Sequence, residues 1–472
     1  MKASGKIRIF LLVLLVCTIL IVLGFSWNNA IGNSIHGSLE LSVTNMDTYT
    51  REFVSDIPII VVRTTVSSLY ESDTPPLAMV WLFDGEGENR LTDNPTAVFE
   101  TATANYRGTT SISFPKKGYS LDLYNQVFLD PLDYPFFGFA PASNWVLRTP
   151  YADKSLLRDW FSQEIAATVL DWQPRGTPVQ LFIQDGENSP IEYEGVYFFT
   201  EKITVGEGRL ELGELTLNSS ATIDYNGGGY VIQKDRPRPN SFALTDYFIV
   251  RHVYPTPGNM TSHQDANLRH EIEFYMHLLG RRGRFDGIAD EYWDYESYID
   301  VDSFINNFLV AELLKNNDMG VFSAFYHRAV GGKFTAGPMW DFDISMGNMD
   351  FSDNIYYDTF FSPNRALFWY LLHDEAFVAR YVSRWYELRE TIWTDEFIFG
   401  MFDSMTEYLS SAAAQNAERW PEKYDGETYI WPNRAPFTQS WEEEIERTRS
   451  WLVSRVRWLD ENMINHFGTI FE

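Results

Sequence analysis

The spacing of hydrophobic positions changes twice along this chain of 472 residues. An uncharged apolar run near the start is followed, from about residue 57, by short runs of alternating or β-branched residues. From about residue 265, apolar positions recur three and four residues apart. Alternation predicts strands, and the longer spacing predicts helices. The sequence therefore predicts an α+β protein in which a β-rich region precedes a helical region.

Strands are expected where the short runs are bounded by Gly, Pro, Asn or Asp. The expected strands are 39–43, 57–62, 78–83, 97–106, 109–114, 119–124, 179–183, 195–202 and 229–233. Residues 156–170 interrupt them with helical spacing, and Asp153 is a candidate cap for that helix. Residues 55–240 are thus predicted to form a β-rich lobe.

Helices are expected in the second half of the chain. They are 268–279, a helix capped by Asp302 and running through Leu313, 377–393, and a final helix that opens with the Ser440 and Glu443 capping box. Residues 241–465 are therefore predicted to form a helical lobe, with a cleft between the two lobes.

The N-terminal segment predicts export. Lys2, Lys6 and Arg8 precede the uncharged run 9–25, which is close to the shortest length that spans a bilayer. The basic flank places the rest of the chain outside the cytoplasm. Residues 1–30 are interpreted as an uncleaved signal anchor and 31–54 as an extracytoplasmic tether, with a cleaved signal peptide as the alternative.

Composition excludes several classes of partner and site. The formal net charge of −28 makes nucleic acid and anionic lipid headgroups poor partners, so the membrane contact is expected through the N-terminal helix alone. Cys17 is the single cysteine and lies in the apolar run. The exported part is therefore expected to hold no disulfide and no cysteine-based metal site.

Two acids stand out in residues 339–348, which read MWDFDISMGN. A strand that runs into Trp340 and turns at Gly347 would present Asp341 and Asp343 at its end. Carboxylates in such a place can hold Mg²⁺ against a phosphate, because Mg²⁺ takes one or two carboxylates and fills its shell with water and phosphate oxygens. The alternative is that these acids cap a turn or pair with arginines.

Residues 107–119, RGTTSISFPKKGY, supply candidate cations. Gly108 lets the chain turn sharply, and Lys116 or Lys117 on a strand could neutralise phosphate oxygens. Glu201 is the acid expected to hold that lysine. The alternative is an edge strand on which lysines prevent aggregation.

Two further sets of polar residues flank these segments. Asp153 and Arg158 lie five residues apart, and a structural ion pair is favoured over direct chemistry. Asp318 follows Asn316 at the end of a helix, 23 residues before Asp341. It could orient or deprotonate an attacking hydroxyl, or it could be a turn residue without a role.

Five segments are informative when they are taken together: RGTTSISFPKKGYSLDL at 107–123, NWVLRTPYADKSLLRD at 144–159, GVYFFTEKI at 195–203 with Arg209 beyond, ELLKNND at 312–318 with Ser323 and Tyr326, and GPMWDFDISMGN at 337–348. With these segments the chain resembles the CotH kinase family, the atypical protein kinases first known from spore coats, over roughly residues 55–465. Their order and spacing agree with the family throughout.

The resemblance implies a two-lobed, protein-kinase-like fold that binds ATP and Mg²⁺ and phosphorylates Ser or Thr. It also implies roles for single residues. Asp318 is the implied catalytic acid, and Asp341 with Asp343 the implied metal ligands. The implied nucleotide-binding residues are Arg107, Lys116, Lys117 and Glu201, and the supporting residues are Asn316, Arg158 and Asp153.

The function expected from these implications is a membrane-anchored kinase that acts on surface or exported proteins. Its partners would be protein substrates with Ser or Thr acceptors. Two alternatives stay open, a catalytically silent surface, coat or adhesion protein and a metal-dependent phosphohydrolase. The chain has no G-x-G-x-x-G loop and no H-R-D triplet, so the usual kinase motifs would not identify it.

Overall fold

The computed structural model describes most of the chain after the N-terminal segment. The described residues are 41, 45–64, 76–126, 129–213, 228–237, 241–245, 248–280, 295–350, 353–360, 371–372, 374–432 and 438–467. The apolar run 9–25, and with it the predicted anchor, lies outside these ranges, as does almost all of the predicted strand 39–43. Among the described helices, none is long and apolar enough to cross a membrane.

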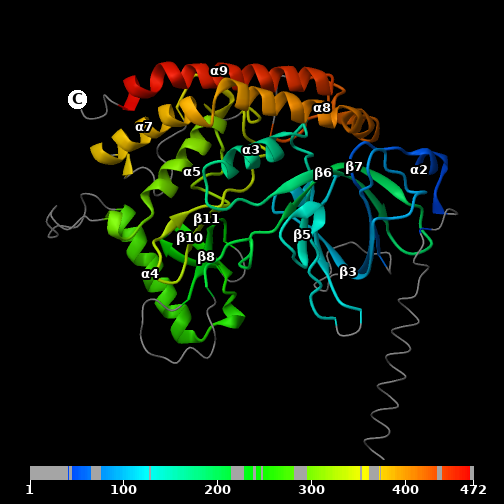
Figure 1. Ribbon diagram of the computed structural model, residues 1–472, viewed down its shortest axis with the longest axis horizontal. Coiled ribbons are helices and arrows are strands. Elements are labelled where there is room, and N and C mark those ends of the chain that lie inside the picture. Colours follow the sequence, from blue (N-terminus) through cyan, green and yellow to red (C-terminus); the bar gives the residue numbers. More distant parts are fainter. Residues whose placement is uncertain are drawn as a thin grey trace, which may run out of the picture. The chain divides into compact units, whose positions relative to one another are not determined.

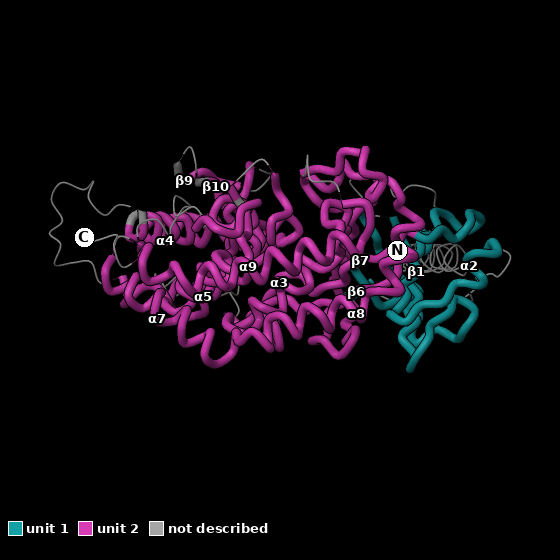
Figure 2. Tube along the Cα trace, turned by 90° about the horizontal axis from the view of Figure 1, so that it is seen from above, with its two compact units in different colours: residues 1–105, 122–131, 181–193 teal, residues 106–121, 132–180, 194–472 magenta. Residues whose placement is uncertain are grey.

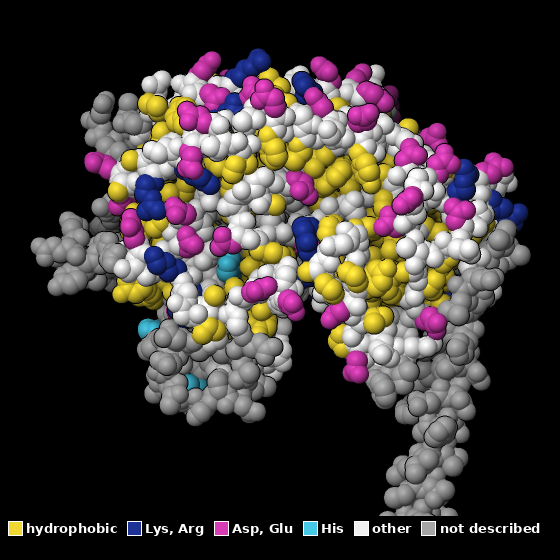
Figure 3. All heavy atoms as spheres, viewed as in Figure 1, with side chains coloured by type: hydrophobic (Ala, Val, Ile, Leu, Met, Phe, Trp, Pro, Cys, Tyr) yellow, Lys and Arg dark blue, Asp and Glu magenta, His cyan; other side chains and the backbone are white. Residues whose placement is uncertain are grey.

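The described chain is a mixed α+β protein with a β-rich region and helices toward its C-terminus, as expected. It divides into two compact units (Figure 2). The first unit comprises residues 1–105, 122–131 and 181–193, and the second comprises 106–121, 132–180 and 194–472. Acidic side chains are scattered over the face drawn in Figure 3, among basic ones, which is typical of a solvated acidic surface.

The first unit is built on antiparallel strands. These are β1 (Ile59–Thr64), β2 (Leu77–Phe83) and most of β3 (Ala97–Arg107), preceded by the short helix α2 (Thr48–Glu52). Val61 pairs with Trp81 across β1 and β2, and both side chains are buried. They belong to an apolar core that also contains Met46, Phe53, Ile59, Met79, Phe83, Leu91, Phe182, Ile191 and Tyr193.

Seven strands close into a barrel in the order β1-β2-β3-β4-β5-β7-β6. The remaining members are β4 (Gly118–Leu123), β5 (Asn144–Arg148), β6 (Gly176–Gln184) and β7 (Glu192–Glu201). In the second unit, β5 pairs with β7 in antiparallel register, with Trp145 opposite Glu201 and Arg148 opposite Phe198. This register places the side chain of Arg148 at the end of a strand whose preceding three residues are buried.

A second sheet of five strands lies entirely in the second unit, in the order β12-β11-β8-β10-β9. Its strands are β8 (Tyr230–Lys234), β9 (Ser241–Thr245), β10 (Phe248–Tyr254), β11 (Ala324–Arg328) and β12 (Thr335–Ala336). Helix α4 (Ser262–Gly280) is tied to this sheet by Glu271, which accepts a hydrogen bond from Tyr230 and pairs with Arg328. The sheet continues across residue 240, where the sequence suggested a change of lobe; the lobe boundary itself stays a prediction.

The other long helices of the second unit are α3 (Arg158–Ala167), α5 (Val301–Leu314), α7 (Glu375–Thr391), α8 (Asp395–Arg419) and α9 (Trp441–Phe467). Helix α9 packs along α5, α7 and α8 (Figure 1). Helix α8 is an element that was not predicted from the sequence. Its buried side chains recur three and four apart, and Thr394 caps its first turn through the Phe397 N–H, so the signal was present.

Three local predictions were wrong. Residues 109–114 form no strand, because Gly108 turns the chain at φ +117° and the 3₁₀ turn Ser111–Ser113 follows. The strand expected to reach Trp340 ends at Ala336, since Pro338 has no N–H to continue a ladder. The cap of α5 is Asp300, whose carboxylate accepts the Ser303 N–H, whereas Asp302 lies in the first turn.

Arg158 is the centre of a buried polar network between α3 and α9. Its guanidinium pairs with Asp153, which confirms the expected structural ion pair, and with Glu444 at 2.9 Å. It also donates to the Thr448 hydroxyl at 2.9 Å. Asp153 in turn accepts the backbone N–H of Arg158 at 2.9 Å, so it satisfies a donor at the start of α3. Because all four side chains are buried, this network fixes how the two helices dock.

We predict that Glu444→Gln destabilises the protein in a pH-dependent way. Burial raises the pKa of Glu444, but Arg158 and Arg447 outweigh burial and lower that pKa to about 2. A carboxylate whose pKa falls on folding stabilises the native state above its unfolded pKa, and the benefit is lost as the pH drops toward the folded value. The shift from an ordinary value near 4.5 corresponds to about 3 kcal/mol at neutral pH.

Urea unfolding of both proteins at several pH values measures this difference. The stability gap should be largest at pH 7 and should shrink steadily below about pH 4.5. The exposed neighbour variant Glu442→Gln is the control and should show little change. A gap for Glu444→Gln that stays constant down to pH 3 would contradict the ion-pair explanation.

Candidate active site

A pocket of about 730 Å³ lies within the second unit. Its walls come from the β3–β4 connection, the end of β5, the chain just after β7, strands β8 and β10, and the segments around residues 318 and 341. The volume is in the range typical of small-molecule sites. The pocket is lined by both signs of charge: Arg107, Arg148, Lys202, Arg236 and Arg251 on one hand, and Asp235, Asp318, Asp341 and Asp343 on the other.

Two side chains hold the carboxylate of Asp341, and Asp159 holds the backbone that follows it. Its backbone is left-handed, with φ +58°, a conformation that costs free energy for a non-glycine residue. One carboxylate oxygen accepts a hydrogen bond from Nη2 of Arg148, with a donor–acceptor distance of 2.8 Å. The other accepts a hydrogen bond from the hydroxyl of Ser323, at 2.5 Å. The next residue, Phe342, is buried and donates its N–H to Asp159 at 2.9 Å. The side chain is still about one-third exposed, so it can contact a ligand in the pocket.

Asp343 lies beside Asp341 in the same pocket. Burial raises its pKa well above the usual range, and the negative charges of Asp159 and Asp341 raise it further, while Arg148 opposes them. The backbone carbonyl of Asp343 accepts a hydrogen bond from Asn348 at 2.6 Å, which fixes the turn. A bound cation would offset this concentration of negative charge.

Asp159 extends from the first turn of α3 to the same place. Its carboxylate is buried, accepts the Phe342 N–H, and forms an ion pair with Arg148 at 3.1 Å. Burial raises its pKa to about 6, and this effect outweighs the opposing influence of Arg148. Asp159 therefore orders the segment that carries Asp341 and Asp343.

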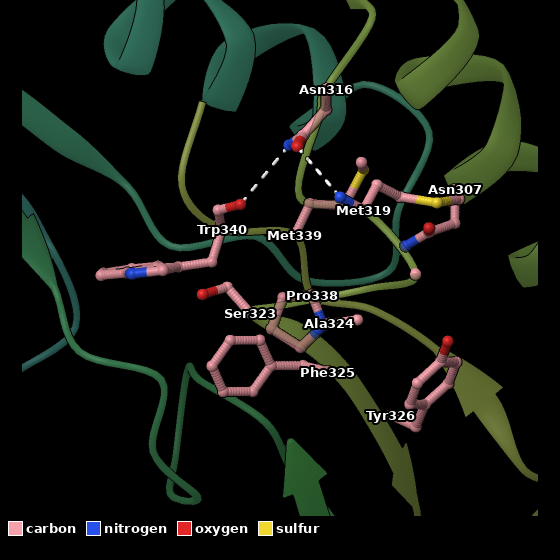
Figure 4. Close-up of a pocket in the computed structure, with 11 residues that line it drawn as sticks. Asn307, Asn316, Met319, Ser323, Ala324, Phe325, Tyr326, Pro338, Met339 and Trp340 are labelled. Atoms are coloured by element: carbon pink, nitrogen blue, oxygen red, sulfur yellow. Dashed lines mark hydrogen bonds between the residues drawn. The ribbon is translucent and has the colours of Figure 1, made fainter. Parts of the chain in front are cut away.

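Asp318 enters the pocket from the loop after α5. Lys315 ends that helix in the left-handed conformation, and the buried Asn316 follows it. Asn316 accepts the N–H of Asp318 at 3.0 Å and that of Met319 at 3.2 Å. Its amide reaches the Trp340 carbonyl at 3.4 Å (Figure 4). Asn316 thus ties the Asp318 loop to the Asp341 segment.

Trp340 forms a platform under the basic side of the pocket. The guanidinium of Arg148 lies 4.6 Å from its ring centroid, and that of Arg107 lies 5.8 Å away. Both distances allow cation–π attraction. The indole belongs to an apolar cluster with Val146 of β5 and Phe325 of β11, so the barrel strand and the five-stranded sheet share one support beneath the site.

The donor set fits a hard divalent cation completed by other ligands. In the part of the chain that the structure describes, no three His, Cys, Asp or Glu side chains are grouped as a metal site. Asp341 and Asp343 nevertheless bring carboxylate oxygens to one wall, and Mg²⁺ commonly takes one or two carboxylates with water and phosphate oxygens.

Comparison with known protein families assigns the chain to one of them. The family model described as CotH kinase protein matches residues 104–459, about three quarters of the chain. The chain belongs to the CotH kinase family. No curated protein matches it. The matched region contains every residue that lines the pocket.

The structure brings together several residues that the resemblance to CotH kinases implicated. Asp318, Asp341, Asp343 and Arg107 line one pocket, and Asn316 ties two segments of its wall together. Asp153 and Arg158 do not line it and belong to the α3–α9 network.

In this CotH family member, the structure does not support a phosphate-binding role for Lys116 or Lys117. Lys116 is fully buried and donates to the Val196 carbonyl and to Asn416, both at 2.7 Å. Burial, reinforced by the nearby Lys423, lowers its pKa well below the usual value. Lys117 donates to the Ile112 carbonyl at 2.7 Å. Neither lysine lines the pocket, and the structure does not bring Lys116 to the acids.

Glu201 likewise does not hold a lysine. Its buried carboxylate pairs with Arg175 at 2.8 Å and lies 3.9 Å from Arg209. The pair that does flank the pocket, Arg148 and Asp159, was missed by the sequence analysis, although both residues lie in the quoted segment 144–159. The available signal was an arginine directly after a run of apolar strand residues, followed by an acid in the first turn of a helix.

We predict that Lys116→Met lowers stability without removing ligand binding from the pocket. The substitution leaves the Val196 carbonyl without its donor and should cost about 1–3 kcal/mol. Urea unfolding measures that loss, and thermal shift with ATP and Mg²⁺ should remain near the wild-type value. The exposed Lys333→Met variant is the control. Loss of the ATP-dependent shift at unchanged stability would contradict a structural role for Lys116.

Proposed function

We propose that this CotH kinase-family protein transfers the γ-phosphate of ATP to Ser or Thr hydroxyls of exported or surface proteins, with Mg²⁺ as the cofactor. The observation that carries the proposal is the convergence of Asp318, Asp341 and Asp343 with Arg107 and Arg148 on one pocket. Phosphoryl transfer depends on positioning and charge neutralisation more than on covalent catalysis. The pocket offers acids that could bind a cation and orient an acceptor hydroxyl, and basic groups that could neutralise phosphates. These are the groups that positioning and charge neutralisation require.

The β3–β4 connection is suited to lie over phosphates. Residues 106–111 line the pocket, and Gly108 turns the chain there at φ +117°. A Cβ at Gly108 would come within 1.9 Å of the Ser111 hydroxyl oxygen, so a side chain cannot be accommodated without rearrangement. In protein kinases a glycine-containing loop between two strands covers the nucleotide phosphates, and this connection is the counterpart we assign.

Asp341 and Asp343 are the residues that would hold Mg²⁺. When bound, the ion supplies positive charge against the triphosphate. Arg148 and Ser323 restrict the Asp341 side chain through its two oxygens, so its direction is set before ligand binding. The hydrogen bond from the Phe342 N–H to Asp159 fixes the backbone between the two acids.

Asp318 is placed to act on the acceptor. In the proposed reaction the acceptor hydroxyl oxygen forms a bond to the γ-phosphorus, the bond to the β–γ bridging oxygen breaks, and ADP leaves. Asp318 orients the hydroxyl and takes its proton. Asn316 secures this loop by accepting the Asp318 N–H.

The order of elements along the chain supports a kinase-like two-lobed fold. Two strands joined by the Gly108 loop are followed by β5, helix α3, strands β6 and β7, and then a sheet and helices. We further propose that residues 9–25 form an uncleaved signal anchor, which would place the pocket outside the cytoplasm. The basic residues before that run support this orientation.

We predict that the purified full-length chain labels itself or an added protein from γ-³²P-ATP in the presence of Mg²⁺. Asp341→Ala should abolish labelling, because a metal ligand is lost. Asp318→Asn should lower the rate by about 100-fold or more while ATP still raises the melting temperature, because only the proton acceptor is lost. Asp302→Ala, an exposed acid on α5, is the control and should label normally.

The same assay separates the alternatives. Release of phosphate to water without any labelled protein would indicate a phosphohydrolase. Absence of label together with no thermal response to ATP and Mg²⁺ would indicate a silent surface protein and would overturn the proposed function. Equal loss of ATP stabilisation in Asp318→Asn would contradict the role given to Asp318.

A further inference from the structure

The pocket needs a cation placed against the phosphates, and Lys116 and Lys117, which lie just before β4, do not fill that role. Lys116 is buried under α8 and Lys117 is bonded to a backbone carbonyl. We infer that Arg148, held by Asp159, is the residue that neutralises the nucleotide phosphates. This inference rests on the proposed function and names the phosphate-binding residue of the same site.

Arg148 lines the pocket, and its neighbours hold its side chain in place. It lines the pocket, while its side chain is only 10% exposed. Nη2 lies 2.8 Å from Asp341 and 3.1 Å from Asp159, and the guanidinium stacks on Trp340. Three neighbours therefore fix the direction of this cation next to the acids assigned to Mg²⁺. If a metal held by Asp341 and Asp343 contacted phosphate oxygens, those oxygens would lie next to the guanidinium of Arg148.

The topology matches the arrangement used by protein kinases. There a strand lysine binds phosphates and is held by a glutamate on a helix, and the ion pair must be in place for activity. Here Arg148 ends β5, and Asp159 lies in the first turn of α3, the next long helix along the chain. The Arg148–Asp159 pair is thus a strand-to-helix ion pair at the edge of the pocket, with arginine in place of lysine and aspartate in place of glutamate.

Arginine gives this position a property that lysine lacks. Its planar fork carries five donors, so one edge can hold carboxylates while other N–H groups bind a ligand. Nη1 of Arg148 is buried and has no hydrogen-bond partner within the described residues. The guanidinium therefore keeps donor capacity that Asp159 and Asp341 do not use. Phosphate oxygens are the acceptors that match such a fork.

The test compares ligands with and without phosphates on four full-length variants. Melting temperatures of wild type, Arg148→Lys, Arg148→Gln and Asp159→Asn are measured against increasing adenosine and against ATP with Mg²⁺. Asp159→Asn keeps an oxygen for the Phe342 N–H but removes the charge that holds Arg148. Arg380→Gln on α7, whose side chain is 41% exposed, is the matched control.

We expect Arg148→Gln to bind ATP about 10- to 100-fold more weakly, which is the loss of one charged hydrogen-bonding group. Adenosine affinity should be unchanged, because adenosine has no phosphate. Arg148→Lys should fall between Gln and wild type, since it keeps the charge and loses the fork. Asp159→Asn should weaken ATP binding and spare adenosine binding, and Arg380→Gln should match wild type.

Wild-type ATP affinity in Arg148→Gln would overturn the inference. So would an equal loss of adenosine and ATP affinity, which would indicate a purely structural role. If the wild type itself responds to neither ligand, the proposed function fails first, and the inference falls with it. If the wild type and Arg148→Gln bind ATP equally well, the proposed function is unaffected. Only the phosphate-binding role of Arg148 is then contradicted.

Discussion

The salt bridges of Arg148 with Asp159 and Asp341 are the interaction on which the site depends. They join the end of β5, the first turn of α3 and the segment after β12 at one point. Without a cation at this point, three neighbouring carboxylates would repel one another in a partly buried place, where burial and the charges of Asp159 and Asp341 both raise the pKa of Asp343. One guanidinium therefore allows the acids to gather, and the acids in turn fix the guanidinium.

The rest of the second unit holds these three elements in register. Arg158, ten residues after Arg148, anchors the start of α3 to α9 through Asp153 and Glu444. Asn316 ties the Asp318 loop to the Trp340 backbone, and the indole rests on the cluster shared by β5 and β11. The left-handed backbone of Asp341 persists because both sides of its carboxylate and the following N–H are bonded. Hydrogen bonds and ion pairs thus position the side chains of the site, and apolar packing positions the helices and strands that carry them.

Sequence periodicity predicted most of the elements, because alternating and three-four spacing report directly on burial. It failed where local chemistry overrides spacing. Gly108 turns the chain in a stretch that alternates, and Pro338 ends a run that reads as strand. The acids of the pocket could be chosen from their motifs. The basic partner was harder to choose, because Lys116 and Lys117 share the same local pattern while their surroundings differ. The signal for Arg148 was weak, because its ion pair with Asp159 forms only when the fold brings the first turn of α3 to the end of β5.

The central claim is that acids distant in sequence and Arg148 converge on one metal–nucleotide complex. Diffraction from crystals grown with Mn²⁺ and a non-hydrolysable ATP analogue, with the metal located by its anomalous scattering, tests this most directly. We expect a metal peak within coordination distance of Asp341 and Asp343 and phosphate oxygens between that metal and the Arg148 guanidinium. A metal bound elsewhere, or a nucleotide whose phosphates lie away from Arg148 and Asp341, would contradict it.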